Sequence, residues 1–138
     1  MTTEPVAEPR AQLKALSSVL RKLHKALVDL ETERFGNPGS AFEHLQLLTS
    51  HPQFAWLRQI SEILVEIDER LDNKDQPVDA EAVETVRKAL GSLLALGPEN
   101  SSEFHQKYLS ALQESPQVAM AHGELRHRMF TPAGDKQA

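Results

Sequence analysis

Cysteine is absent from this 138-residue sequence, which excludes disulfides, zinc–cysteine sites, iron–sulfur clusters and thiol catalysis. No apolar run approaches the roughly 20 residues that a membrane helix needs. The six glycines are scattered, so no phosphate-binding loop is present. A net charge of −5 argues against a general nucleic-acid binder, which usually carries a basic stripe. The N-terminus has no basic start followed by an apolar run, so we expect no signal peptide and a cytoplasmic location.

What the chain does contain is enough hydrophobic sequence, 40% of its residues, to bury the core of a single domain. Leucines at spacings of three and four predict a first helix from about 10 to 34. These are Leu13, Leu16, Leu20, Leu23, Leu27 and Leu30.

Start and stop signals divide the rest of the chain. They predict helices over 41–49, 52 to about 72 and 80–96, one opened by Asn100 and Glu103, and a last one carrying Val118 and Met129. No strand-like alternation occurs. We therefore predict an all-α, single-domain antiparallel helical bundle of five to six helices over residues 10–130, with disordered tails at 1–9 and 131–138.

The segment from 52 to 72 is the most apolar, and its hydrophobic residues cover more than one helical stripe. This width predicts a central position in contact with several neighbours. Phe54 and Trp56 lie about 200° apart on a regular helix, and we interpret them either as core residues or as anchors of a dimer contact or partner groove.

Polar side chains interrupt the apolar faces at four positions, which are His24, Glu31, Asp68 and His122. They either form a metal or small-ligand site between facing helices or bond one another and set the register of the bundle. Spacing does not support a metal: Glu124 and His127 form one Glu-x-x-His pair without a second, and no two histidines lie four residues apart. The metal therefore stays unknown, and we expect no cofactor.

Charge is unevenly distributed along the chain. Residues 62–84 contain nine acidic and two basic residues, whereas the first predicted helix carries five basic residues between Arg10 and Lys25. Opposite charges attract, so we expect these two segments to lie side by side.

The segment Leu23–Leu27 and the runs His51–Leu57 and Ile63–Glu69 resemble a group of small bacterial all-helical proteins of unassigned function. The resemblance covers about the first 70 residues well and the rest loosely. It implies a bacterial, cytoplasmic, all-helical protein and supplies no reaction.

Three functions are compatible with these features. The first is a non-enzymatic interaction module that binds a second copy of the chain or another protein through an exposed apolar groove near Phe54 and Trp56, with no membrane or nucleic-acid partner. The second is a metal- or small-ligand-binding bundle that uses the four polar residues. The third is an enzyme in which carboxylates and a histidine perform acid–base chemistry.

Overall fold

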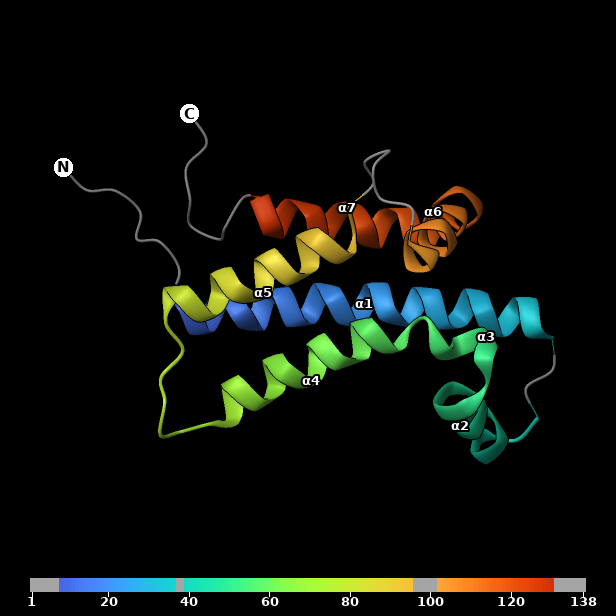
Figure 1. Ribbon diagram of the computed structural model, residues 1–138, viewed down its shortest axis with the longest axis horizontal. Helices are drawn as coiled ribbons and strands as arrows, with labels where there is room; N and C mark the ends of the chain where they lie inside the picture. The colour runs from blue at the N-terminus through green and yellow to red at the C-terminus, as the bar shows by residue number, and fades with distance from the viewer. Residues whose placement is uncertain (1–7, 37–38, 96–101, 131–138) are drawn as a thin grey trace.

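The computed structural model describes residues 8–36, 39–95 and 102–130, and every regular element in these ranges is an α-helix (Figure 1). The predicted all-α class is therefore confirmed. The helices are α1 (Pro9–Phe35), α2 (Ala41–Ser50), α3 (Pro52–Ala55), α4 (Arg58–Asp72), α5 (Ala80–Leu93), α6 (Glu103–Glu114) and α7 (Pro116–Phe130).

The described residues form seven helices rather than five or six, because the helix predicted from 52 to 72 is divided at Trp56 and Leu57. Both Phe54 and Trp56 are buried, and a regular helix turns positions two apart to opposite sides. The backbone at this point instead forms a tighter turn than an α-helix, with hydrogen bonds between residues three apart rather than four. The Leu57 amide bonds to the Phe54 carbonyl and the Ile60 amide to the Leu57 carbonyl, both at 3.1 Å and both spanning three residues.

The centre of the fold is α1, not the segment 52–72. Helix α1 packs against α3, α4, α5 and α7, and Figure 1 shows it running between α4 and α5. Its narrow leucine stripe is buried along its whole length. By contrast, α4 buries only Ile60, Leu64 and Ile67, and its wider apolar face leaves Val65 54% exposed. The broad face of α4 does not mark a central helix.

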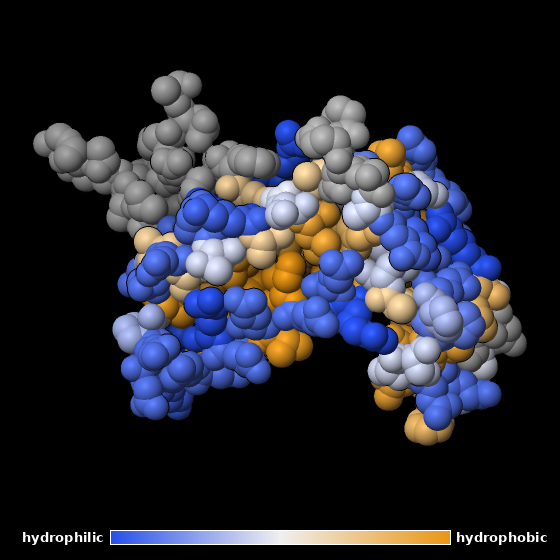
Figure 2. All heavy atoms as spheres, in the orientation of Figure 1, coloured by the Kyte–Doolittle hydropathy of each residue, from blue (hydrophilic) through white to orange (hydrophobic). Residues whose placement is uncertain are grey.

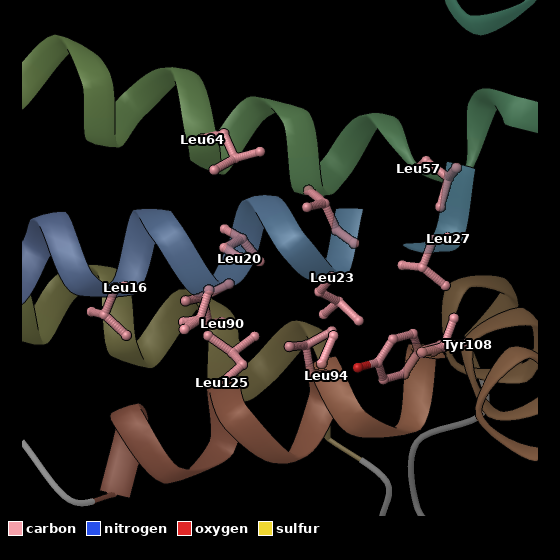
Figure 3. Close-up of a cluster of buried hydrophobic side chains, with 14 of the residues drawn as sticks. Leu16, Leu20, Leu23, Leu27, Leu57, Leu64, Leu90, Leu94, Tyr108 and Leu125 are labelled. Atoms are coloured by element: carbon pink, nitrogen blue, oxygen red, sulfur yellow. The ribbon is translucent and has the colours of Figure 1, made fainter. Parts of the chain in front are cut away.

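Leucines on α1, α4, α5 and α7 form a large part of the hydrophobic core. Figure 3 shows Leu16 and Leu23 of α1 converging with Leu90 of α5 and Leu125 of α7, each at most 2% exposed. A fully buried leucine contributes roughly 1.5–3 kcal/mol relative to an exposed one. This core holds the long helices together, and α2 contributes no fully buried residue to it.

Side-chain caps mark where α2, α5 and α6 begin. Ser40 and Glu43 form a capping box at the start of α2, in which the Ser40 hydroxyl accepts from the Glu43 amide and the Glu43 carboxylate accepts from the Ser40 amide. Asp79 caps α5 through the Ala82 amide. Helix α6 is capped by Ser102; the predicted cap Asn100 lies outside the described residues.

The boundaries of the predicted tails can be compared with the structure only at residues 8 and 9. Glu8 is the N-cap of α1 and Pro9 its first residue, so this helix begins one residue before the predicted domain boundary. Residues 1–7 and 131–138 lie outside the described ranges. At its other end α1 stops at Gly36, whose φ of 104° favours glycine.

The oppositely charged segments lie side by side, as predicted. Arg21 of α1 forms an ion pair with Asp68 of α4, in which Nη2 of Arg21 donates to Oδ1 and Oδ2 of Asp68 at 2.8 and 2.6 Å. Both side chains are about half exposed, so this pair stabilises the fold by less than about 1 kcal/mol.

Candidate functional site

The four predicted ligand residues each bond to a residue outside the set. His24 Nε2 lies 3.0 Å from the Ser61 hydroxyl, and His122 Nδ1 lies 2.6 Å from the Tyr108 hydroxyl. Asp68 is paired with Arg21 on the surface. Glu31 is buried and bonds to Trp56. The structure brings each residue to a different partner rather than to a shared centre.

The two histidines lie in half-buried positions that favour the neutral imidazole. Burial and then the positive charge of Arg21 lower the pKa of His24. Burial and then the charge of Arg126 lower the pKa of His122. Burial raises the pKa of Tyr108, so the phenol keeps its proton, and its hydroxyl shares a hydrogen bond with Nδ1 of His122.

Metal binding has no geometric basis in the described part of the chain. Within residues 8–36, 39–95 and 102–130, no three histidine, aspartate or glutamate side chains lie close enough to hold a metal ion.

The most concentrated polar chemistry lies around Glu31, near the C-terminal end of α1. Its side chain is only 6% exposed. Trp56 Nε1 donates to Glu31 Oε2 at 2.6 Å, and Gln53 Nε2 donates to Glu31 Oε1 at 3.3 Å and to the Glu31 carbonyl at 3.1 Å. A buried carboxylate needs such donors to offset its lost hydration. We call Glu31, Gln53, Trp56 and Arg34 the Glu31 cluster.

The cluster extends to α6 through Arg34. One guanidinium nitrogen of Arg34 lies 3.6 Å from Glu31 Oε1, and another bonds to the carboxylate of Glu114. The hydrogen bond to Glu114 is the largest of the effects that raise the pKa of Arg34. The guanidinium of Arg34 thus bridges the buried carboxylate of Glu31 on α1 and the exposed carboxylate of Glu114 on α6.

A row of aromatic rings continues from Trp56 into the fold. The Trp56 ring contacts the Phe104 ring edge-on, with 5.2 Å between the ring centroids, and Phe104 stacks on Tyr108 at a centroid distance of 5.6 Å. The ring centroids of Tyr108 and His122 lie 5.5 Å apart. Such ring pairs add about 0.5–1.5 kcal/mol each. The row connects the Glu31 cluster with α6 and α7.

Together these contacts fix the position of α3 and, through it, of α2. Gln53 and Trp56 tie α3 and the following turn to α1. His51, between α2 and α3, contacts the Phe35 ring edge-on at 5.1 Å. A second tie joins α2 to α1 directly, because the Thr32 hydroxyl lies 2.9 Å from His44 Nε2. Helix α2 is therefore anchored at defined points.

None of the ten residues of α2 is buried in the described structure. Figure 1 shows α2 below α3, beyond the end of α4. Phe42 is 67% and Leu45 57% exposed; one turn apart, they lie on one side of the helix. We call Phe42 and Leu45 the α2 apolar face.

The predicted interface residues occupy the core instead of a surface groove. Phe54 is 2% and Trp56 7% exposed. Sequence reasoning missed the α2 apolar face, although a signal was available. Residues 42, 45, 47 and 48 are all apolar and are too widely spread around a helix for one core contact. In the structure Leu47 and Leu48 pack against the core, which leaves Phe42 and Leu45 outside.

No described helix is long and apolar enough to cross a membrane. Comparisons with protein-family models, with curated proteins and with solved structures find no match, which is consistent with a family of unassigned function.

Proposed function

We propose that this protein is a non-enzymatic interaction module that self-associates through the α2 apolar face. The observation that carries the proposal is the exposure of Phe42 and Leu45 on a helix that contributes no buried residue to its own fold. Leaving two large apolar side chains in water costs free energy that a contact between molecules recovers. The helices behind α2, taken as an antiparallel bundle, serve as the scaffold.

Charge supports a second copy of this chain as the occupant. Two identical chains of net charge −5 repel each other most where acids gather and least where they are few. Helix α2 contains one acidic residue, Glu43, and that carboxylate is engaged in the capping box. A twofold axis would place Phe42 and Leu45 against the same residues of the second copy.

The size of α2 sets the expected strength of this association. Ten residues of helix span about 15 Å, so contact between two such helices falls short of the roughly 800 Å² per partner found in stable interfaces. We therefore expect a reversible dimer with Kd in the micromolar range or weaker. We further propose a bacterial, cytoplasmic location, which rests on the resemblance to small bacterial proteins alone.

Sedimentation velocity over a wide concentration range tests the proposal. We expect the wild-type protein to shift from monomer to dimer as concentration rises. The double variant Phe42→Ser/Leu45→Ser is expected to stay monomeric to concentrations at least about tenfold higher, because each lost apolar contact costs 1 kcal/mol or more.

The matched control is Val65→Ser/Met120→Ser. These side chains are 54% and 72% exposed and lie on α4 and α7, away from the α2 apolar face. The control is expected to dimerise like the wild type. A wild-type protein that remains monomeric throughout the range, or a control variant that loses dimerisation equally, rejects self-association through α2.

A further inference from the structure

A second surface lies between α4 and α5. Both helices pack on α1 and leave two hollows between them, of about 430 and 800 Å³. Glu66 lines both hollows, so they adjoin each other. In Figure 2 hydrophobic atoms are visible between α4 and α5, bordered by hydrophilic ones. We call this surface the α4–α5 groove.

The groove has the length and the lining that a helix requires. Along α4 it extends from Gln59 to Asn73, which is about 20 Å or four helical turns. Ile63 and Leu93, both half-buried, provide apolar contact from the two sides. A groove of this kind receives the apolar face of an amphipathic helix.

The wall contributed by α5 consists mainly of small side chains. Ala82, Thr85, Ala89 and Ser92 follow one another at spacings of three and four and all line the groove. Small residues allow a neighbouring helix to approach toward the short end of the usual 8–10 Å interaxial range. This wall therefore leaves room for a partner helix. Large side chains at these positions would fill that room.

The border of the groove is strongly acidic. Six carboxylates line it, from Glu62, Glu66, Glu69, Asp75, Asp79 and Glu81, against one guanidinium. That guanidinium, of Arg70, pairs with Glu66 at 3.1 Å. Among the described residues, Glu62, Glu69, Asp75 and Glu81 form no ion pair with a base. The groove therefore complements a partner that presents positive charge beside an apolar stripe.

We propose that the α4–α5 groove binds a basic amphipathic α-helix of a partner protein. The apolar stripe of that helix lies on Ile63 and Leu93, and its lysines or arginines face the carboxylates on the border. The inference rests on the proposed role as an interaction module, but it uses a surface separate from α2. A second copy of this acidic chain fits the groove poorly because its net charge has the same sign.

A fluorescein-labelled peptide of about 15 leucine and lysine residues, arranged with helical periodicity, is the probe. Fluorescence anisotropy measures its affinity. A peptide of the same composition in a scrambled order without an apolar stripe, and one with glutamate in place of lysine, are the peptide controls. We expect the amphipathic basic peptide to bind at least about tenfold more tightly than either control.

Charge reversal then locates the binding surface. The variant Glu62→Lys/Glu69→Lys/Glu81→Lys is expected to weaken binding at least about tenfold. The matched control, Glu33→Lys/Glu103→Lys/Glu124→Lys, alters the net charge equally at exposed sites outside the groove and is expected to change binding less than about threefold. Ala89→Trp, which fills the groove without changing charge, is expected to weaken binding as strongly as the groove reversal. Circular dichroism confirms that each variant is folded.

Equal weakening by both charge reversals, equal binding of the scrambled peptide, or unchanged binding to a folded Ala89→Trp variant overturns the groove proposal. Loss of peptide binding in Phe42→Ser/Leu45→Ser assigns the peptide to α2 and overturns it as well. Failure of self-association is detected separately, because the concentration dependence of sedimentation is measured without peptide.

Discussion

Trp56 Nε1 donates a hydrogen bond to Glu31 Oε2 at 2.6 Å, and both residues are almost completely buried. This bond links the turn between α3 and α4 to α1. It also accounts for the divided helix: a regular helix with Phe54 in the core would turn the indole away from Glu31. The bond is one of the contacts that fix the position of α3 and, through it, of α2. Helix α2 carries the proposed contact surface.

Removing the buried carboxylate is expected to destabilise the fold. Glu31→Ala leaves the indole N–H of Trp56 without its acceptor and leaves the Gln53 amide bonded only to the backbone carbonyl of residue 31. It also leaves Arg34 with one carboxylate fewer. We expect a loss of about 2–4 kcal/mol in the free energy of unfolding. Urea denaturation followed by the fluorescence of Trp56, the sole tryptophan, measures it.

Glu33→Ala is the control for that substitution, because Glu33 is an exposed glutamate on the same helix. Its unfolding free energy is expected to stay within about 0.5 kcal/mol of the wild type. Similar values for the two variants would show that the Glu31 cluster contributes little to stability.

Stability is expected to fall as the solution is acidified below about pH 6.5, the ordinary pKa of histidine. The folded state lowers the pKa of His24 and of His122, mainly through burial. Between the lowered and the ordinary pKa the unfolded chain binds more protons, so stability is complete above pH 6.5 and is lost as the pH falls through the folded values. In protonated His122 both ring nitrogens carry hydrogen, so Nδ1 can then only donate to the Tyr108 oxygen.

Urea midpoints measured from pH 7.5 to pH 5 test this dependence. The double variant His24→Asn/His122→Asn is expected to show a smaller decrease over that range than the wild type, whatever its stability at pH 7.5. His127→Asn, an exposed histidine of α7, controls for the substitution itself. A double variant with the full wild-type decrease contradicts the assignment to His24 and His122.

Two leucine-to-alanine substitutions are expected to separate the scaffold from the contact surface. Leu23 is fully buried in α1, whereas Leu45 on α2 is 57% exposed. Leu23→Ala is expected to cost about 2–5 kcal/mol because it leaves a cavity. Leu45→Ala is expected to change the unfolding free energy by less than about 0.5 kcal/mol.

Chemical denaturation at low protein concentration measures both variants, since dilution removes any contribution from a dimer. A large cost for Leu45→Ala under these conditions would mean that the α2 apolar face packs within its own chain, and the proposed contact would lose its basis.

Much of the local structure was predictable from the pattern of residues within single helices. The leucine stripe of α1, the Ser40–Glu43 capping box and the Asp79 cap depend on residues three or four positions apart, and these spacings act within a single helix. The same local patterns suggested that polar residues on apolar faces would attract particular partners. They could not show that His122 meets Tyr108 and His24 meets Ser61, because each pair joins different helices.

The sequence by itself determined the helical class, the absence of thiol and disulfide chemistry, the start of most helices and the pairing of a basic with an acidic segment. Only the tertiary structure decided which helix is central, where the segment 52–72 is divided and which apolar side chains remain in water. The physical reason is that burial depends on the area covered by all neighbouring helices together. A face as wide as that of α4 can be covered in part, and Phe42 and Leu45 can be left uncovered, without any change in the local pattern that makes their helices.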